Sequence, residues 1–265
     1  MTPPPKLAVT DLSMYFGGVS AIMDLSFELK EGEIFALIGP NGAGKSTVFN
    51  CISGIYRPNR GRIYFEGEEI THLRPHKVAR KGIARTFQNI ALFRNMTVLD
   101  NLLLGRNPSL KAGVIRGGIF WGKAVREELA SRLAVEKLID FLEIESVRKK
   151  LVGTLPFGIQ RRVELGRALA LEPRLLLLDE PVSGMNVEET EDMARFILDI
   201  NETFGMTILL VEHDMGVVMD ISDRILVINF GEKIAEGNPE TIGRDPEVIK
   251  AYLGEEADGI NPEQH

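Results

Sequence analysis

A glycine-rich run near the start of the chain contains residues that could bind phosphate. The run Gly39-Pro40-Asn41-Gly42-Ala43-Gly44-Lys45-Ser46 fits the G-x-x-x-x-G-K-[ST] spacing of a phosphate loop. In such a loop, glycines let backbone N–H groups turn toward phosphate oxygens at the positive end of a helix. Lys45 adds a positive charge for the β- and γ-phosphates, and Ser46 supplies a hydroxyl for Mg²⁺. The run therefore predicts a site for a nucleotide and its magnesium ion.

A pair of carboxylates forms the second candidate group. The apolar stretch Leu175 to Leu178 is typical of a buried strand, and Asp179 and Glu180 follow it directly. An aspartate at the tip of a strand beside a phosphate loop can orient Mg²⁺. The glutamate next to it can orient, or take a proton from, the water that attacks a γ-phosphate. Together with the phosphate loop, the pair indicates hydrolysis of a nucleotide at its γ-phosphate.

A histidine is the third candidate. Another apolar stretch, Thr207 to Val211, ends in Glu212-His213-Asp214. If this strand and the strand before Asp179 are parallel neighbours, their carboxyl ends lie on one rim, where the ligands of such sheets gather. We therefore expect His213 to lie beside Glu180 and to contact phosphate.

The elements around these residues follow the order of an α/β nucleotide-binding unit. Strand patterns run through residues 6–65 and include the buried-looking Ile34 to Ile38, after which come the phosphate loop and helical spacing from Lys45. Strand patterns return before Asp179, at Thr207 to Val211 and at Arg224 to Ile228, with helical patterns between them. Because this alternation is typical of parallel sheets, we expect an α/β fold.

The middle third of the chain has a different pattern. Helical spacing runs through Thr97 to Leu104, Lys123 to Leu142 and Gly158 to Ala170, and the glycine-rich stretch Gly105 to Gly122 separates the first two. We expect these helices to form a subdomain inserted into the α/β core. A further helix, Glu188 to Phe204, carries an apolar stripe that predicts packing against the sheet.

Composition limits the class of protein. Of the 265 residues, 44% are hydrophobic, which is enough for a sizeable core, and the formal net charge of −7 argues against a primary nucleic-acid binder. The single cysteine, Cys51, cannot form an internal disulfide and indicates a reducing compartment. The sequence begins without the pattern of a signal peptide, and its apolar runs are shorter than the roughly 18 residues that span a bilayer. A role at a membrane would therefore depend on a partner.

The order of these motifs resembles that in the ATP-binding subunits of ATP-binding cassette (ABC) transporters, over nearly the whole chain. The resemblance implies a P-loop ATPase core with an antiparallel β subdomain and an inserted α-helical subdomain. Residues 1–88 and 171–240 would form the β and ATPase core, residues 89–170 the helical subdomain, and residues 241–265 a C-terminal tail. ATP and Mg²⁺ are the implied cofactors.

The resemblance also implies roles for single residues. Phe16 matches the aromatic residue that stacks on adenine, and Gln88 matches the glutamine that contacts Mg²⁺ and the attacking water. The implied catalytic residues are Lys45, Gln88, Glu180 and His213. The implied nucleotide-binding residues are Phe16, Gly39, Pro40, Asn41, Gly42, Ala43, Gly44, Lys45, Ser46, Thr47 and Asp179. The implied magnesium ligands are Ser46, Gln88 and Asp179.

One motif departs from the family pattern. The family signature is usually Leu-Ser-Gly-Gly-Gln and caps the γ-phosphate bound by the opposite subunit, whereas this chain has Leu155-Pro156-Phe157-Gly158-Ile159-Gln160. Pro156 suits the first turn of a helix but offers neither a hydroxyl nor an N–H donor. The helix dipole and the N–H groups after it remain. We therefore predict a weakened contribution to the partner's ATP site and a complete set of contacts to this chain's own ATP.

Within the family, the chain is most similar to the ATPases of branched-chain amino acid importers. The stretches that carry this similarity are Asn41 to Asn50, Arg85 to Gln88, Leu92 to Val98, Gly105 to Gly122, Glu212 to Met215 and Asp245 to Gly254. The similarity implies a peripheral subunit at the cytoplasmic face of the cell membrane. Its partners would be two transmembrane permease subunits, a second ATPase subunit that is a different chain and, indirectly, a solute-binding protein, with no nucleic acid. Relatives are associated with other amino acids, amides and urea, so the solute stays open.

The family arrangement places two ATPase subunits head to tail, with each ATP between one phosphate loop and the other subunit's signature. Ser183-Gly184-Met185-Asn186 occupies the place of a loop that meets the opposite subunit. A groove beside Gln88 would receive the permease, and residues Asn89 to Met96 are candidates to line it. The apolar stretch Gly117 to Trp121 is either packed locally or docked on a partner or a lipid surface.

Two alternative functions stay open on sequence grounds. One is a soluble ABC ATPase that acts on DNA, ribosomes or chromosomes. Residues 47–174 leave no room for the long coiled coil of the DNA-repair and chromosome members, and the chain holds one cassette where ribosome-acting members usually join two. The other is the ATPase of an exporter of the lipopolysaccharide type. The Gly105 to Gly122 stretch and the C-terminal tail favour an importer.

Overall fold

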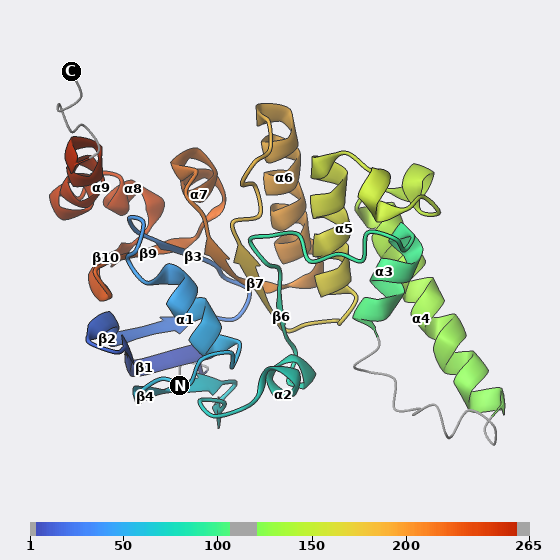
Figure 1. Cartoon of the computed structure of the whole chain (residues 1–265), viewed down its shortest axis with the longest axis horizontal. Coiled ribbons are helices and arrows are strands. Elements are labelled where there is room, and N and C mark those ends of the chain that lie inside the picture. The colour runs from blue at the N-terminus through green and yellow to red at the C-terminus, as the bar shows by residue number, and fades with distance from the viewer. Residues whose placement is uncertain (1–3, 107–120, 259–265) are drawn as a thin grey trace.

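Two sheets organise the computed structural model, which describes residues 4–106 and 121–258 (Figure 1). In the described chain, the antiparallel sheet has the order β2-β1-β4-β5 and the mainly parallel sheet the order β10-β9-β3-β8-β7-β6. The strands are β1 (Leu7–Phe16), β2 (Val19–Leu29), β3 (Ile34–Ile38), β4 (Arg60–Phe65), β5 (Glu68–Glu69), β6 (Ile83–Arg85), β7 (Leu175–Asp179), β8 (Thr207–Val211), β9 (Arg224–Asn229) and β10 (Glu232–Gly237). The helices are α1 (Lys45–Ile52), α2 (Pro75–Arg80), α3 (Val98–Gly105), α4 (Trp121–Phe141), α5 (Phe157–Leu169), α6 (Val187–Phe204), α7 (Met215–Ile221), α8 (Pro239–Ile242) and α9 (Pro246–Asp258).

The central strands β3, β7 and β8 are buried along their whole length. Helices or the second sheet cover both faces of a sheet of this kind, which explains why these strands are continuous apolar runs without alternation. Along β7, Leu175 and Leu177 face one core cluster, whereas Leu176 and Leu178 face another. The expected α/β fold with a parallel sheet is confirmed.

Three clusters of buried side chains hold the layers together. The first joins α1 to the antiparallel sheet and to one face of the parallel sheet, through residues such as Phe49 and Phe35. The second packs α6 and α3 to α5 on the opposite face, and the third packs α7, α8 and α9 near β9. Figure 1 shows α3, α4 and α5 together at one end of the molecule and α8 and α9 at the other. The phosphate-loop helix is thus fixed between two sheets.

Strands β7 and β8 are parallel neighbours, and Asp179 pairs with Val211 in their register. The residues that follow, Glu180 and Glu212, therefore leave the sheet at the same level. This arrangement meets the condition on which the expected position of His213 depends.

Local sequence explains where several helices begin. The Thr97 side chain accepts a hydrogen bond from the Asp100 amide and so caps α3, and Asn186 and Glu189 form a capping box at α6. Buried Asn101 bonds both backbone groups of Phe93 and so fixes the segment before α3. The predicted helices in these regions are confirmed to within two residues.

Some elements differ from the sequence expectations. Strand β6 and helices α2 and α8 are too short to show a period, and the predicted tail contains the helix α9. Most of the Gly105 to Gly122 stretch, including Gly117 to Phe120, lies outside the described residues.

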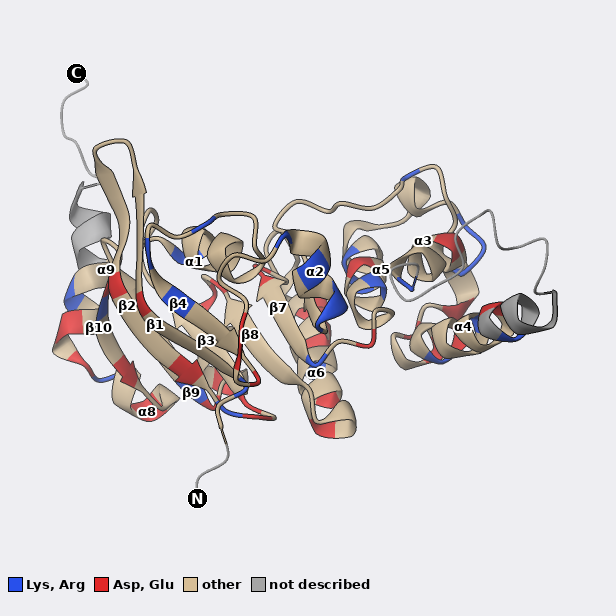
Figure 2. Ribbon diagram, turned by 90° about the horizontal axis from the view of Figure 1, so that it is seen from below, with Lys and Arg blue, Asp and Glu red and all other residues tan. Residues whose placement is uncertain are grey.

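In the described chain, no helix has the length and apolar character that crossing a membrane requires. Acidic and basic residues are interspersed along the strands and helices (Figure 2).

Candidate nucleotide-binding site

The phosphate loop connects β3 to α1, as the sequence predicts. Gly39, Gly42 and Gly44 have φ angles of 152°, 78° and 107°. A Cβ atom at Gly44 would stand 2.5 Å from the carbonyl oxygen of Ala21 on β2, so only glycine fits there. Throughout this fully described helix, no side chain caps α1 and no acidic residue occupies its first turn. The first-turn N–H groups and the helix dipole therefore favour an anion at the loop.

The ammonium group of Lys45 is held inside this loop. Its Nζ donates to the carbonyl oxygens of Gly39 at 2.6 Å and Pro40 at 2.9 Å, and the residue is buried. A buried cation attracts a polyanion more strongly than an exposed one because solvent screens it less. Lys45 thus supplies positive charge at the point where the loop would receive phosphates.

A cavity of about 290 Å³ opens over the phosphate loop. Four lining residues come from outside the phosphate loop and its helix, and three of them, Gln88, Glu180 and His213, are predicted catalytic residues. The lining residues are Ala21, Asn41, Gly42, Ala43, Gly44, Lys45, Ser46, Thr47, Gln88, Glu180 and His213. The structure therefore brings together most of the predicted nucleotide-binding and catalytic residues, although Phe16, Gly39, Pro40 and Asp179 do not line this cavity.

The carboxylate of Glu180 is held between two partners from separate loops. Its Oε2 accepts a hydrogen bond of 2.9 Å from Gln88 Nε2, and its Oε1 lies 2.9 Å from His213 Nε2. The side chain of Glu180 is 10% exposed, whereas that of His213 is 41% exposed. Glu180 also has a positive φ of 51°, a strained conformation that the bond from its N–H to the Val211 carbonyl helps to hold. A fixed carboxylate at the wall of a phosphate cavity can orient a water molecule for attack.

Glu212 is a residue of this site to which the sequence analysis assigns no role. It is 2% exposed, and its carboxylate accepts hydrogen bonds from the backbone N–H groups of Val182 at 2.8 Å and His213 at 2.9 Å. Burial raises the pKa of Glu212, and the nearby Glu180 carboxylate acts in the same direction. The side chain joins the loop after β7, which carries Glu180, to the loop that carries His213. Its position directly after a predicted parallel strand is the signal that could have revealed it.

Asp179 lies behind the cavity and has a charged partner. Its Oδ2 accepts a hydrogen bond of 2.7 Å from Arg85 at the end of β6, and its N–H donates to Thr86 Oγ1 at 3.2 Å. Arg85 stands within a motif that the sequence analysis uses, yet it has no assigned role there. The contact between Arg85 and Asp179 could not be predicted from the sequence. Strand β6 is too short to recognise from its pattern, and the positive charge of Arg85 does not by itself indicate a partner.

The donor set of the site fits magnesium. Ser46 and Gln88 line the cavity with a hydroxyl and an amide, and the carboxylate of Asp179 lies at the end of β7, directly before Glu180, which lines the cavity. Mg²⁺ prefers such oxygen ligands and usually combines one or two carboxylates with the phosphates of a substrate. The residues present therefore agree with a metal ion that binds together with a nucleotide.

Phe16 ends β1 on the surface and is 43% exposed. Its ring lies 5.3 Å from that of Tyr56 in an edge-to-face arrangement. An exposed aromatic face held by a second ring is suited to stacking on a planar base. The structure thus places an accessible ring at Phe16, with Tyr56 as a support that the sequence did not indicate.

The signature run begins α5. Pro156 is the residue before the helix rather than a residue of its first turn, and no side chain caps the helix, which is described throughout. Gly158 allows a close approach, because a Cβ atom there would stand 2.4 Å from Glu189 Oε1. Gln160 turns inward and donates to the Leu155 carbonyl at 2.8 Å. None of the described residues from Leu155 to Gln160 lines the cavity over the phosphate loop.

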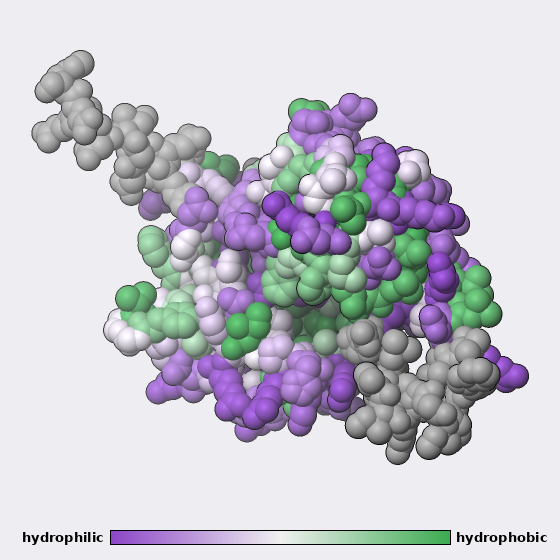
Figure 3. All heavy atoms as spheres, turned by 45° about the vertical axis from the view of Figure 1, so that its right-hand side comes forward, coloured by the Kyte–Doolittle hydropathy of each residue, from purple (hydrophilic) through white to green (hydrophobic). Residues whose placement is uncertain are grey.

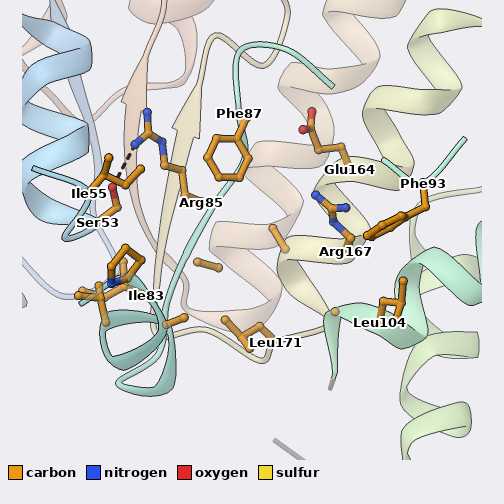
Figure 4. A pocket seen from close by; sticks show the side chains of 16 residues that line it. Ser53, Ile55, Ile83, Arg85, Phe87, Phe93, Leu104, Glu164, Arg167 and Leu171 are labelled. Atoms are coloured by element: carbon orange, nitrogen blue, oxygen red, sulfur yellow. Dashed lines mark hydrogen bonds between the residues drawn. The ribbon is translucent and has the colours of Figure 1, made fainter. Parts of the chain in front are cut away.

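A second cavity, of about 360 Å³, forms a groove between the core and the helical group. The close-up shows Ser53, Ile55 and Arg85 on one side, with Phe93 and Arg167 across from them (Figure 4). A hollow with hydrophobic walls and hydrophilic borders is visible in the space-filling view (Figure 3). The residues that line the groove are Ser53, Ile55, Pro75, Val78, Ala79, Ile83, Ala84, Arg85, Phe87, Phe93, Leu104, Gly105, Glu164, Arg167, Ala168 and Leu171. Of the candidates from Asn89 to Met96, Phe93 lines it.

Helix α5 holds the backbone of the segment that carries Gln88. Buried Arg161 donates to the carbonyl oxygens of Phe87 at 3.0 Å and Gln88 at 2.7 Å, and it forms an ion pair with Glu164 at 3.0 Å. Burial raises the pKa of Glu164, although Arg161 opposes this shift. The position of Gln88 in the nucleotide cavity is therefore tied to the helix that begins with the signature run.

The fold combines a parallel sheet, a phosphate loop after β3, a buried carboxylate after β7 that lines the same cavity, and a separate signature helix, as expected of an α/β ATPase. A family model described as ABC transporter matches residues 22–183, which is more than half of the chain. A second model, described as branched-chain amino acid ATP-binding cassette transporter, matches residues 232–258. The chain belongs to the ABC transporter family and is an ATP-hydrolysing subunit of that family.

Known proteins show the same relationship along almost the whole chain. The high-affinity branched-chain amino acid transport ATP-binding protein BraF of Pseudomonas aeruginosa is 45% identical over 254 residues, which cover 95% of this chain and 98% of BraF. The corresponding protein LivG of Salmonella typhimurium is 44% identical over 255 residues, with coverage of 95% and 98%. A solved ABC transporter cassette in its ADP conformation has a TM-score of 0.83 and 32% identity, with coverage of 95% and 99%. The predicted family resemblance is confirmed.

Proposed function

We propose that this chain is the motor subunit of an importer for branched-chain amino acids or related small solutes. The relatives BraF and LivG carry that function in their names, and the second family model points to the same group through the C-terminal residues. These comparisons favour the importer over an exporter and over a soluble ATPase. The observation that carries the proposal is the Gln88–Glu180–His213 group above the phosphate loop, because it supplies the hydrolysis that would drive transport.

The residues of the cavity suggest how ATP is cleaved. Backbone N–H groups of the phosphate loop and Lys45 hold the phosphates, Gln88 and Glu180 orient the attacking water, and His213 stabilises charge on the γ-phosphate. Glu180 accepts the proton of that water as its oxygen attacks phosphorus and the bond to ADP breaks. When bound through Ser46, Gln88 and Asp179, Mg²⁺ would neutralise part of the phosphate charge.

The site requires a partner subunit in this proposal. The signature run lies outside the chain's own cavity, and Ser183 and Gly184 are exposed in the loop before α6. Two ATPase subunits would therefore face each other, and ATP would favour the closed pair because it touches both. We infer a different chain as the partner. Residues 1–88 and 171–240 would act as the core, residues 89–170 as the helical subdomain and residues 241–265 as the tail.

The groove beside Arg85 and Phe93 is the proposed docking place of a permease segment. Its walls are mainly apolar, with Arg85, Glu164 and Arg167 among the lining residues, and α5 connects it to Gln88 through Arg161. Two permease subunits would hold the chain peripherally at the inner face of the cell membrane. Movement of the helical group on ATP binding would then reach the permease directly.

Purification of the tagged Glu180→Gln variant with ATP and Mg²⁺ from detergent-solubilised membranes tests this function. The variant should bind ATP without hydrolysing it efficiently and hold the complex closed. We expect mass spectrometry to find two permease chains and a second ABC ATPase. Vesicles that contain the wild-type complex and the solute-binding protein should then take up labelled leucine, and the Glu180→Gln complex should not. Recovery of ribosomes, nucleic acid or only soluble proteins would contradict the proposal.

A further inference from the structure

A guanidinium group connects the groove to the nucleotide site. We propose that Arg85 orients the Asp179 carboxylate for the magnesium ion of bound ATP and thereby links the occupant of the groove to that carboxylate. The proposal rests on the magnesium–ATP site of the proposed function. It concerns a positioning residue, since Arg85 does not line the cavity over the phosphate loop.

The guanidinium of Arg85 has partners on two elements of the nucleotide site. One nitrogen donates to Asp179 Oδ2 at 2.7 Å, and another donates to Asn50 Oδ1 at 2.8 Å and to Ser53 Oγ at 3.0 Å. Asn50 lies on α1, the helix that begins with Lys45, and Ser53 caps its C-terminus. Arg85 therefore fixes the strand end of Asp179 relative to the phosphate-loop helix.

Two aromatic rings restrict this side chain further. The guanidinium carbon lies 5.4 Å from the ring centre of Phe49 and 5.4 Å from that of Phe87. The side chains of Arg85 and Asp179 are 9% and 6% exposed. A guanidinium between rings offers its N–H groups in a rigid plane, so it presents one fixed geometry to the carboxylate.

Such a contact controls how a carboxylate meets a metal ion. Arg85 occupies Oδ2 and so sets the orientation in which the second oxygen of Asp179 is presented. Partners that hold a metal-binding carboxylate are a recognised determinant of affinity, and removing one weakens metal binding by roughly 10- to 100-fold. Without Arg85, the buried carboxylate would lose its ion pair and its fixed orientation.

The same side chain forms part of the groove wall. Figure 4 shows Arg85 beside Ser53 and near the ring of Phe87, and all three residues line the groove. An occupant of the groove is thus separated from Asp179 by one side chain. A permease segment in this groove would therefore reach the Asp179 carboxylate through Arg85 alone.

Magnesium titrations of nucleotide binding test this role. The purified chain is mixed with a fluorescent, non-hydrolysable ATP analogue, first in EDTA and then at increasing Mg²⁺, and the half-saturating Mg²⁺ concentration is measured. For Arg85→Met we expect that concentration to rise by about tenfold or more, with affinity in EDTA unchanged. Arg85→Lys keeps the charge but loses the planar fork, so it should give an intermediate value.

Arg174→Met is the matched control. Arg174 directly precedes β7, whereas Asp179 ends that strand. Its guanidinium stacks over Phe65 and forms an ion pair with Glu66. It should leave the magnesium requirement unchanged, and thermal unfolding should verify that each variant folds. If Arg85→Met does not fold, the same magnesium titration is made with Arg85→Lys and with Ser53→Ala, which removes one of the hydrogen bonds that hold Arg85. An unchanged magnesium requirement in the folded variants, or an equal loss of affinity in EDTA, would overturn the inference. Failure of the wild-type chain to bind the analogue would instead contradict the proposed function.

Discussion

The imidazole of His213 and the carboxylate of Glu180 meet at 2.9 Å across the ends of two neighbouring strands. The register of β7 and β8 produces this contact, because Asp179 pairs with Val211 and the next residues leave the sheet together. His213 is the more exposed of the two side chains. It can therefore reach a bound phosphate while its Nε2 stays beside the carboxylate that would act on water.

Replacing His213 by alanine is expected to slow ATP turnover more than it weakens ATP binding. The variant loses a polar group that faces both Glu180 and the cavity, while Lys45 and the phosphate-loop N–H groups remain. Removing one group that stabilises developing charge in the transition state typically slows turnover by about 10²- to 10³-fold, so we expect at least about 10²-fold slower turnover. Steady-state ATPase activity of the assembled transporter and binding of a non-hydrolysable analogue measure the two effects. The exposed His72→Ala is the control, and equal slowing in both variants would contradict the role of His213.

Glu212→Ala should impair the site without touching the nucleotide. The carboxylate holds the backbone N–H groups of Val182 and His213, and the alanine variant leaves both without this acceptor. Hydrogen bonds to charged groups contribute about 1.5–3 kcal/mol each, so we expect a lower free energy of unfolding together with a lower kcat.

Glu212→Gln is the informative companion to that variant. Its single carboxamide oxygen can still accept one of the two hydrogen bonds, so activity and stability should lie between those of the wild type and Glu212→Ala. The KM for ATP should stay close to the wild-type value in both variants, because no contact of Glu212 involves the phosphate loop. A change confined to KM would count against a positioning role.

The local parts of the site follow from the sequence. The phosphate loop and the Asp179–Glu180 pair stand directly after apolar strand patterns, and His213 follows its strand by two residues, so spacing along the chain is enough to find them. The position of His213 beside Glu180 needs one further rule, that parallel strands end on one rim. Spacing identifies the glycine at position 44, although the physical reason for it is a contact with another strand, since a Cβ atom there would stand 2.5 Å from the carbonyl oxygen of Ala21 on β2.

The contacts of Arg85, Glu212 and Arg161 could not be predicted in this way. Each depends on which strands or helices are neighbours in space, and β6, which carries Arg85, is too short to show a period. The groove has the same limitation, because its walls come from α2, α3, α5 and β6, which are separated along the chain. Sequence patterns identified the elements, whereas register and packing determined these partners.

Cys51 is expected to remain unreactive toward thiol reagents in the folded protein. It is 2% exposed on α1, and burial raises its pKa to about 12. The thiolate is the reactive form, so both access and ionisation are suppressed at neutral pH. Because the folded pKa lies above the unfolded value of about 8.5, the stability due to this group is intact at neutral pH and is lost as pH rises toward about 12. Labelling with a maleimide, with and without denaturant, measures this, and rapid labelling of the native chain would refute it.

Pro156→Ser is expected to raise ATP turnover of the assembled transporter by a few-fold. Such an increase requires less than about 1.4 kcal/mol of added transition-state stabilisation, which would give tenfold. Pro156 precedes α5 without a capping side chain, so serine would restore both a hydroxyl and an N–H group at the end that would face the partner's ATP in the proposed pair. Serine would also cap the helix and stabilise the isolated chain by about 1 kcal/mol, which thermal unfolding of that chain measures separately. Pro156→Ala restores the N–H group without the hydroxyl, so it separates the two contributions. If neither variant changes turnover in the complex, the atypical signature does not weaken the partner's site.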